Sequence, residues 1–304
     1  MILKKVFNKL FNKLISPVPF DFYFVFQKQT HFQGIKQNFR QNSGYIPDIN
    51  CPKTFNEKLT HRKLYCRDEI WVTVTDKVAV RDYLLENGLP DGLHLIPVIE
   101  VFDSLEKLRE ANLPKEFIAK AAWASGKNFI VRDFEIQRNQ LLKQVKRWFQ
   151  EYKAYGKRKL IWPAQSIQRR IIIEELLQDT NGEPPPDYKF FVFHGKCQFF
   201  QIDTGRHNKH ERSLFTRDAK PLNLIKSKVP ASSKIDIPLN LSKMIEVSES
   251  LAQNFDFVRV DLYVSGTKIY FGEFTQTPGN GCGAFDPVSF DLKFGEYWNY
   301  PLVK

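Results

Sequence analysis

The sequence predicts an α+β fold built on two antiparallel sheet layers, with a helical region at the N-terminus. Alternating apolar residues flank tight-turn glycines in the ranges 187–203 and 257–275, which predicts the hairpins of one layer. Two shorter apolar strands, at 116–120 and 129–131, flank a small-residue loop and predict the other layer. Amphipathic helical patterns separate the two groups of strands, so we expect the layers to fold as distinct subdomains.

Capping signals mark the start of the expected helices. Thr54 and Glu57 fit a capping box, and Asp76 fits the N-cap of a helix that ends at Gly88. The other expected elements are a short helix capped by Asp103 or Ser104, strands at 96–102 and 170–177, helices at 134–152 and 240–255, and irregular chain at 218–238.

Composition restricts the class of protein. Lys and Arg exceed Asp and Glu by 45 to 34, which gives a net charge of +11 and favours polyanionic partners. No zinc-finger, RNP or basic-zipper pattern accompanies this charge, so nucleic acid is not expected as a partner. The four cysteines form no CxxC pair, which argues against a disulfide framework or zinc site and favours a cytoplasmic location. No apolar run approaches the roughly 20 residues of a membrane-spanning helix.

Residues 1–16 form a basic amphipathic pattern. Apolar residues from Leu3 to Leu14 recur on one helical face, and the four lysines lie mostly on the other. Such a helix either makes peripheral contact with an anionic membrane surface or docks on its own domain. The segment lacks the uninterrupted apolar core of a signal peptide.

The loop between strands 116–120 and 129–131 predicts a flap over phosphate groups. Lys120 ends the first strand, and Ser125-Gly126-Lys127 lies in the loop that leads to the second. Gly126 permits a sharp turn that presents backbone N–H groups, while Lys120 and Lys127 supply positive charge. An ordinary hairpin is the alternative interpretation.

An acidic strand end follows in the segment 170–177. This apolar strand carries Glu174 and Glu175, whose carboxylates can accept hydrogen bonds from an adenine amine or a ribose hydroxyl. A strand that simply runs out into solvent is the alternative. The Pro- and Gly-containing segment 179–186 then indicates a linker at a domain edge.

The next hairpin contributes a lysine and a basic loop. Lys189 lies within the strand 187–194, either as a phosphate contact or as a surface residue with its ammonium in water. The loop 206–212 is expected to be solvated or to bind anions, with His207 and His210 as alternative metal ligands.

The last hairpin carries one acid on each strand, Asp261 and Glu273. Two carboxylates on adjacent strands form a rigid clamp for a hard cation such as Mg²⁺. An even loop centred on Ser265-Gly266 would point the acids to opposite faces, so we predict an odd-length turn or a bulge at Gly266 or Gly272. An edge hairpin with two solvated acids is the alternative.

Taken in order, these segments resemble the ATP-grasp fold, in which ATP lies between two antiparallel sheet layers. The resemblance is greatest to the TupA-like family, associated with teichuronopeptide and capsular polysaccharide biosynthesis, and it spans about residues 52 to 295. It is carried by PKTFNEKL (52–59), TDKVAVRDYL (75–84), LPKEFIAKAAWASGKNFIV (113–131), IIIEELL (171–177), DYKFFVFHGK (187–196) and FDFVRVDLY...KIYFGEFTQTPGNG (255–281).

The resemblance implies a division of the chain and a role for each matched residue. The expected ranges are 1–50 for the helical lead-in, 51–112 for an α/β region, 113–178 for a central subdomain and 179–304 for a C-terminal subdomain. The expected roles are phosphate binding by Lys120, Ser125, Gly126, Lys127 and Lys189, adenine and ribose binding by Glu174 or Glu175 with the backbone to Leu177, and charge stabilisation during catalysis by Arg259 and Lys189.

The resemblance also implies Mg²⁺ held by Asp261 and Glu273. Related ligases place Asn two residues after the second acid, whereas this chain has Thr275, a weaker ligand for magnesium. Thr275, Gln276 or Asn280 is therefore expected to complete the metal site.

The activity that follows is an ATP-dependent carboxylate–amine ligase with an acylphosphate intermediate, acting in cell-surface polysaccharide biosynthesis. An acidic small molecule or glycan would be its substrate, and a cytoplasmic location at the inner membrane face would suit a lipid-linked glycan. A phosphotransferase acting on a sugar hydroxyl, and a basic glycan- or membrane-binding protein with a decayed ATP site, are the alternatives.

Overall fold

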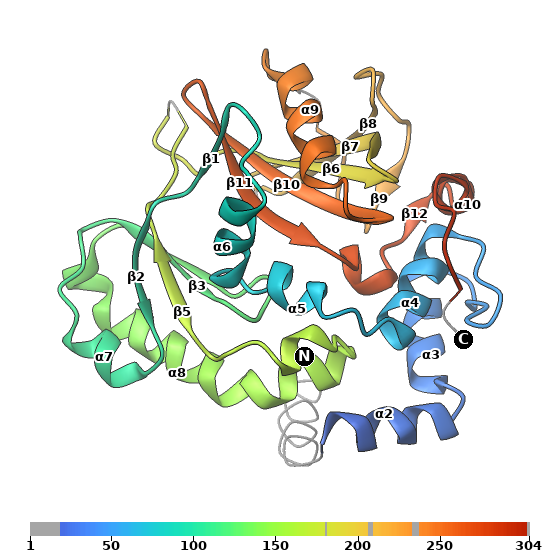
Figure 1. Cartoon of the computed structure of the whole chain (residues 1–304), viewed down its shortest axis with the longest axis horizontal. Coiled ribbons are helices and arrows are strands. Elements are labelled where there is room, and N and C mark those ends of the chain that lie inside the picture. Colours follow the sequence, from blue (N-terminus) through green and yellow to red (C-terminus); the bar gives the residue numbers. More distant parts are fainter. Residues whose placement is uncertain (1–18, 180, 206–208, 233–236, 303–304) are drawn as a thin grey trace. The chain divides into compact units, whose positions relative to one another are not determined.

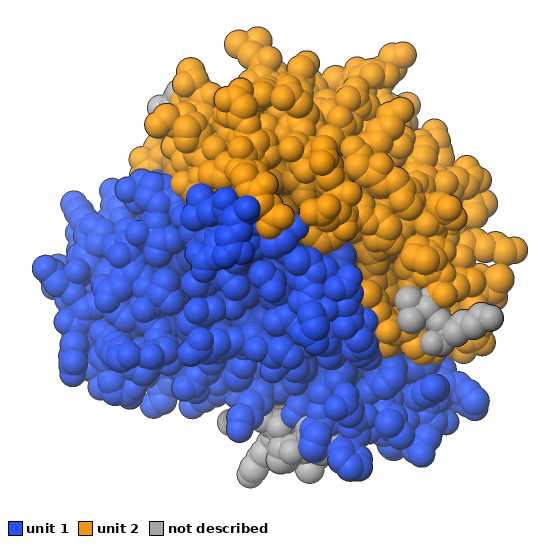
Figure 2. Space-filling model, viewed as in Figure 1, with its two compact units in different colours: residues 1–33, 67–86, 96–176 blue, residues 34–66, 87–95, 177–304 orange. Residues whose placement is uncertain are grey.

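The computed structural model describes residues 19–179, 181–205, 209–232 and 237–302, so the predicted helix 1–16 and His207 lie outside the described residues. The chain forms two compact units that interleave along the sequence (Figures 1 and 2). Unit 1 takes residues 1–33, 67–86 and 96–176, and unit 2 takes residues 34–66, 87–95 and 177–304. The predicted range 51–112 therefore contributes to both units.

Unit 1 contains a 4-stranded antiparallel sheet in the order β2-β5-β3-β4 (Figure 1). Its strands are β2 (Val98–Phe102), β3 (Phe117–Ala121), β4 (Asn128–Val131) and β5 (Ile171–Glu174). Alternation along β3 places Phe117, Ala119 and Ala121 in the core, against apolar residues of the long helix α8 (Phe134–Lys159). Lys120 consequently lies on the opposite face of the sheet.

The other helices of unit 1 are short. They are α2 (Phe20–Gln29), α5 (Ile70–Thr75), α6 (Ala79–Glu86), α7 (Leu105–Glu110) and the 3₁₀ turn η1 (Pro163–Gln165). The side chain of Ser104 accepts a hydrogen bond from the backbone N–H of Lys107 and caps α7. Of the two predicted caps, Asp103 and Ser104, the structure therefore shows Ser104. Throughout the part of the chain that is described, every helix is too short or too polar to cross a bilayer.

Unit 2 contains a 6-stranded sheet in the order β1-β11-β10-β6-β7-β8. All neighbours are antiparallel except β1 and β11, which run parallel. The strands are β1 (Leu93–Leu95), β6 (Asp187–Phe193), β7 (Lys196–Thr204), β8 (Glu211–Thr216), β10 (Phe257–Ser265) and β11 (Lys268–Thr275), and a separate pair joins β9 (Ile225–Lys226) to β12 (Phe285–Asp286). Helices α3 (Gln33–Ser43), α4 (Phe55–Tyr65), α9 (Leu241–Leu251), α10 (Ser289–Glu296) and the 3₁₀ turn η2 (Pro278–Gly281) complete the unit.

Aromatic residues form the core on one face of this sheet. Phe191, Phe199 and Phe257 of the sheet pack with Phe55 of α4 and Phe294 of α10. The predicted capping box opens α4: the Thr54 hydroxyl accepts from the N–H of Glu57, and the Glu57 carboxylate accepts from the N–H of Thr54. This cap fixes the point at which α4 starts to pack on the aromatic core.

Several segments differ from the sequence-based prediction. The predicted end of the loop 206–212 is wrong, because Glu211 and Arg212 already belong to strand β8, which pairs with β7. Alternation along β8 starts at charged residues, and this conceals the strand in the sequence. The segment 218–238 contains β9, and helix α8 continues to Lys159 rather than ending at 152. Strand β1 was not predicted, since three residues are too few to show a period.

Candidate functional site

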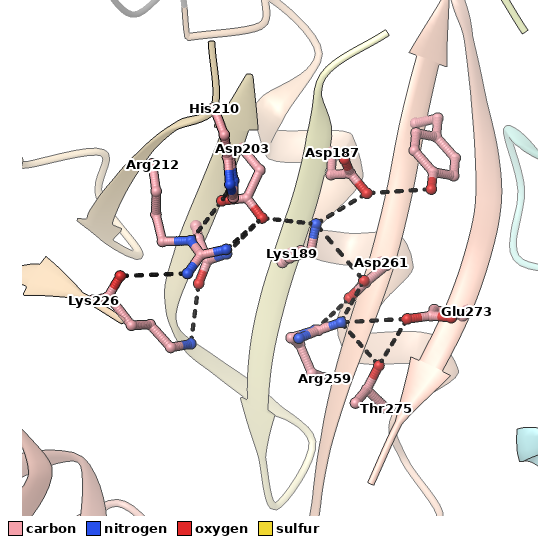
Figure 3. Close-up of polar contacts among 12 residues, drawn as sticks. Asp187, Lys189, Asp203, His210, Arg212, Lys226, Arg259, Asp261, Glu273 and Thr275 are labelled. Carbon is pink, nitrogen blue, oxygen red and sulfur yellow. Dashed lines mark hydrogen bonds and ion pairs between the residues drawn. The ribbon is translucent and has the colours of Figure 1, made fainter. Parts of the chain in front are cut away.

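One face of the unit 2 sheet changes from aromatic to charged along its strands. On β6, Phe193 and Phe191 belong to the core, while Lys189 and Asp187 follow at the same period of two. Pairing places side chains of neighbouring strands beside them, since Lys189 lies opposite Gln201 on β7 and opposite Asp261 on β10. The sheet register therefore gathers a polar cluster (Figure 3) beside the aromatic core.

A β-bulge brings Asp261 and Glu273 to the same face. The hairpin turn lies between Ser265 and Lys268, which alone would set Asp261 opposite Gly272. The register shifts between Asp261 and Leu262, so Asp261 pairs with Glu273 instead. Of the three predicted alternatives, an odd-length turn and a bulge at Gly266 or Gly272, the structure confirms the bulge at Gly272.

Glycine is required at this bulge by close backbone approach. A Cβ atom at Gly272 would lie 2.9 Å from the backbone oxygen of Asp261 and 2.8 Å from the ring of Tyr263. Both distances are shorter than real Cβ contacts. The sequence therefore encodes the alignment of the two acids through a residue that carries no side chain.

The Arg259 guanidinium joins the predicted metal ligands (Figure 3). Its Nε and Nη2 atoms each donate to one carboxylate oxygen of Asp261, both at 2.6 Å. The same Nη2 lies 2.9 Å from the hydroxyl of Thr275 and 3.4 Å from Glu273, and that hydroxyl donates to Glu273 at 3.2 Å. Oxygens of all three predicted ligands thus converge on one cationic nitrogen.

Lys189 forms ion pairs with acids on three strands. Its Nζ lies 3.0 Å from Asp187, 3.1 Å from Asp203 and 4.0 Å from Asp261. The side chain is 5% exposed, so these ion pairs are shielded from water. The ammonium is therefore held between carboxylates of three strands, with Asp187 and Asp203 at the shortest distances.

A second group of charges extends the cluster beyond the predicted residues. Asp203 on β7 accepts from Arg212 Nε at 2.6 Å and Nη2 at 3.1 Å, and from the Gln201 amide at 2.9 Å. The Lys226 ammonium donates to Gln201 at 3.0 Å and lies 4.4 Å above the ring of Phe191. His210, predicted only as an alternative metal ligand, contacts Asp203 at 3.4 Å.

Sequence reasoning missed Asp203, Arg212, Gln201 and Lys226 as members of the site. Asp203 lies near the end of a predicted strand, two residues after Gln201, so the two side chains share a face of the sheet. Gln201 pairs with Lys189 on the neighbouring strand, and the hairpin pattern could therefore have placed Asp203 beside Lys189. Lys226 carried no signal, because the segment around it is irregular in sequence.

Burial and charge set opposite pKa shifts on the two central aspartates. Burial raises the pKa of Asp261 to about 6, although Arg259 and Lys189 act in the opposite direction. Burial also disfavours the charged form of Asp203, but hydrogen bonds and charge from Arg212 and Lys189 outweigh it and hold this pKa well below its usual range. Burial, followed by repulsion from Arg212 and Arg259, lowers the pKa of Lys226 well below that of an ordinary lysine.

In unit 1 the structure brings together two of the predicted nucleotide contacts. The Lys120 ammonium lies 2.6 Å from the carboxylate of Glu174, which also contacts Arg81 at 3.4 Å. Lys120 and Glu174 share the sheet face opposite α8, because Lys120 pairs with Ile172 and Ile118 pairs with Glu174. Glu175 is exposed at the end of the strand, so the two glutamates have different environments.

The predicted flap joins β3 to β4 and is anchored at one end. Trp123 is buried beside Tyr152 of α8, with ring centroids 5.1 Å apart. The N–H of Ser125 donates to the hydroxyl of Tyr155 at 3.0 Å, and Gly126 has a φ of +70°, as a tight turn requires. Lys127 contacts Glu151 of α8 at 2.5 Å, so its charge is partly neutralised in this structure.

Other predicted residues have no contact with these groups. Gln276 and Asn280 make no hydrogen bond to Asp261 or Glu273 among the described residues, and Leu177 is half-buried in the segment that opens the last part of unit 2. Three or more His, Cys, Asp or Glu side chains in metal-binding geometry are absent from the described part of the chain. Any cation site here would therefore combine carboxylates with the Thr275 hydroxyl.

Comparisons with known proteins identify relatives of this chain. A family model described as TupA-like ATPgrasp matches residues 57–299. No curated protein sequence matches. Among solved structures, a D-alanine–D-alanine ligase from Helicobacter pylori is 14% identical, with 79% of this chain and 65% of that chain covered and a TM-score of 0.44.

Two further solved structures are similar at the same level. A D-alanine–D-alanine ligase from Bacillus anthracis is 15% identical, with 68% of this chain and 58% of that chain covered and a TM-score of 0.41. The ATP-grasp ligase PsnB, solved with a precursor variant, Mg and ADP, is 10% identical, with 73% and 53% covered and a TM-score of 0.38. This chain thus spans less than two thirds of the length of each ligase.

Proposed function

The chain belongs to the TupA-like ATP-grasp family, and on that premise we propose that it is an ATP- and Mg²⁺-dependent carboxylate–amine ligase. A carboxylate oxygen of the substrate attacks the γ-phosphorus of ATP, and ADP leaves. An amine then attacks the carbonyl carbon of the acylphosphate, inorganic phosphate leaves, and an amide bond remains. Phosphoryl transfer of this kind depends mainly on positioning and on neutralising charge.

The convergence of oxygens on Arg259 is the observation that carries this proposal. A cationic nitrogen already lies within 3.4 Å of Asp261, Glu273 and Thr275, so these residues provide an oxygen cage that suits a hard cation. We assign Mg²⁺ to the same oxygens, where it would neutralise phosphate charge when bound. Arg259 would then be displaced from Asp261 and become available to stabilise the charge of the transferring phosphoryl group.

The remaining residues are assigned to the nucleotide. Lys120 would contact the α- and β-phosphates, and Lys189 would contribute charge toward the transferred phosphate. The backbone of Ser125-Gly126-Lys127 would close over the phosphates, which requires Lys127 to exchange its ion pair with Glu151. Glu175, exposed at the strand end, is the better candidate than Glu174 for the adenine or ribose contact, with the backbone to Leu177 beside it.

The substrate class is proposed from charge. The excess of basic residues suits an acidic small molecule or glycan. We therefore place the reaction in cell-surface polysaccharide biosynthesis, on the cytoplasmic side, where ATP is available and free thiols such as those of all four cysteines persist. Residues 1–16 would provide peripheral contact with the membrane.

Amine-dependent release of ADP tests the activity. The wild-type protein is incubated with Mg·ATP, a panel of uronic acids and amino acids, and an amine; a ligase releases ADP only when both acceptor and amine are present. Glu273→Gln should reduce turnover by about 100-fold or more, with an unchanged circular-dichroism melting curve. The exposed acid Asp218 supplies the control, Asp218→Asn, which should retain wild-type turnover.

Two outcomes would reject the assignment. Full turnover in both Glu273→Gln and Asp261→Asn would exclude these carboxylates from the metal site. A stable phosphorylated product formed without an amine would identify a phosphotransferase instead of a ligase.

A further inference from the structure

Most of the excess positive charge lies in one segment of unit 1. Residues 143–170 contain nine lysines and arginines but a single acid, Glu151, and this accounts for eight of the eleven net positive charges of the chain. The segment comprises the second half of α8 and the chain that leads to β5. None of these cations belongs to the predicted nucleotide or metal site.

The cations of α8 lie along one face of the helix. Lys143, Lys146, Arg147, Lys153 and Lys157 follow each other at offsets of 0, 3, 4, 10 and 14 residues, which at 3.6 residues per turn covers an arc of about 120°. We call these five residues the basic stripe. The first four are exposed, and none of those four forms an ion pair with a described acid. Glu151, the acid of this segment, forms its ion pair with Lys127 of the loop between β3 and β4.

The helix dipole explains only part of this arrangement. Cations stabilise the last turn of a helix, and Lys157 has this position in α8 (Phe134–Lys159). Lys143, Lys146 and Arg147 lie three turns or more from the end, where the dipole has little effect. Like charges three or four residues apart repel each other, so the stripe is unfavourable for the isolated helix and favourable for a helix that meets an anion.

A cavity lies at one end of the stripe. Its volume is about 180 Å³, and Tyr152, Lys153, Lys157, Ala164 and Gln165 line it. Because a water molecule takes up only about 30 Å³, the cavity has room for a larger group. Lys157 is buried there, and burial followed by repulsion from Lys153 lowers its pKa.

The amide of one residue that lines the cavity lacks a partner. The Nε2 atom of Gln165 is buried and makes no hydrogen bond to any described residue. Gly156 leaves the room for this side chain, because a Cβ at that position would collide with the Gln165 amide and lie 2.8 Å from the backbone oxygen of Ile161. A buried donor without an acceptor is costly, and a bound acceptor group would satisfy it.

We propose that the basic stripe and this cavity bind an acidic polysaccharide. The stripe spans about 21 Å of helix, which suits a polymer with repeated carboxylates rather than a single small anion. The cavity adds a recessed set of donors, in which two ammonium groups and one neutral amide match the carboxylate and hydroxyl groups of one sugar residue. A flat bilayer surface would meet the stripe but would leave the recessed amide unsatisfied.

This inference extends the proposed function, since it places the acceptor polymer on unit 1 through contacts separate from the reacting groups. Polygalacturonate, a uronic-acid polymer, serves as the probe, and binding is measured by calorimetry on the full chain without ATP. The triple variant Lys143→Gln, Lys146→Gln, Lys153→Gln should bind at least about tenfold more weakly. Gln165→Leu should also weaken binding, with the effect retained at high salt because the amide is uncharged.

A matched control separates the stripe from overall charge. Lys196, Lys268 and Lys293 are exposed lysines of unit 2, and their triple replacement by Gln removes the same charge. This control should keep polygalacturonate affinity within about threefold of wild type, since surface charges elsewhere act only through screened long-range attraction. Equal losses in both triple variants would overturn the proposal.

Two further measurements distinguish a polysaccharide from a membrane surface as the ligand of the basic stripe, and binding at the stripe from the ligase activity. Stripe-dependent binding to phosphatidylglycerol vesicles without binding to polygalacturonate would overturn the proposal in favour of a membrane surface. ADP release with a small acceptor and an amine should be unchanged in the stripe variant. Failure of that activity in the wild-type protein would reject the ligase assignment, whereas polygalacturonate binding would still test the stripe.

Discussion

The two sheets hold their charged residues in different ways. The sheet of unit 1 carries one acid, Glu174, that contacts two cations, Lys120 of the same sheet and Arg81 of helix α6. The sheet of unit 2 carries a network in which every acid contacts at least one basic side chain. Asp203 contacts three of them, Lys189, Arg212 and His210. The two sheets therefore differ in the number of ionic contacts that each charged residue makes, and in how many other charges lose a partner when that residue is replaced.

This difference has a functional meaning under the proposed activity. A single pair such as Lys120 with Glu174 releases its lysine to an incoming phosphate at the cost of one contact. In the network, the Asp261 carboxylate is already bridged by Arg259 and neutralised, so a metal ion has to replace a protein cation. Unit 2 is therefore organised before its ligand arrives, and exchange of cations would be its response to binding.

The largest expected effect is the loss of Asp203. Asp203→Ala removes the acid that accepts two hydrogen bonds from Arg212 and one of the three acids around Lys189. The charge of Arg212 then loses its carboxylate, whereas Lys189 keeps Asp187 and Asp261, and the free energy of unfolding should fall by about 3–5 kcal/mol. Urea denaturation measures the change. Asp103→Ala, an exposed acid paired with Lys107 in unit 1, should leave the midpoint nearly unchanged; equal losses in the two variants would contradict the comparison.

The bulge at Gly272 should give the next largest effect. Gly272→Ala forces a Cβ against the backbone of Asp261, so we expect a loss of about 1–3 kcal/mol together with loss of Mg·ATP affinity as the two acids separate. Gly266→Ala is the control, because its Cβ would meet open space and its only strain is a φ of +60°. If titration calorimetry shows unchanged nucleotide affinity for Gly272→Ala, the alignment of the acids is unimportant.

Lys120→Met should have a smaller effect on stability. Glu174 keeps Arg81 at 3.4 Å, so removal of one charged hydrogen bond should cost about 1–2 kcal/mol. Under the proposed function, Mg·ATP affinity should fall about tenfold. Lys115→Met, at an exposed position of the same unit, should change neither quantity, and a normal nucleotide affinity for Lys120→Met would remove Lys120 from the phosphate site.

Acid titration gives the smallest expected effect. The pKa of Asp203 is depressed in the folded state, so its stabilising contribution is present above the unfolded pKa and is lost as pH falls below it. The unfolded value is roughly 3.9, and the folded protein should lose about 1 kcal/mol between pH 4 and 3 on account of this residue. Asp203→Asn should lack this component in a series of urea curves; an identical slope would contradict the assignment.

Local patterns were sufficient for the hairpins and for the capping box at Thr54, and they limited the alignment of the two acids to an odd-length turn or a bulge at Gly266 or Gly272, of which the structure shows the last. Each of these depends on residues close together in sequence, where side-chain period and glycine geometry act directly. The same reasoning missed β1 and β8, because a strand at the edge of a sheet shows little alternation when it is short or begins with charges. It also missed Lys226, which reaches Gln201 from an irregular segment.

The sequence by itself determined which residue types are available: the paired acids of the last hairpin, the lysines of the two sheets and the basic excess of residues 143–170. Tertiary structure decided which of them meet. Strand order placed β10 between β11 and β6, so that Arg259 bridges Asp261, Glu273 and Thr275 while Lys189 faces the acids of three strands. Charges interact over a few ångströms in space, and that distance depends on sheet register and order, which no local pattern specifies.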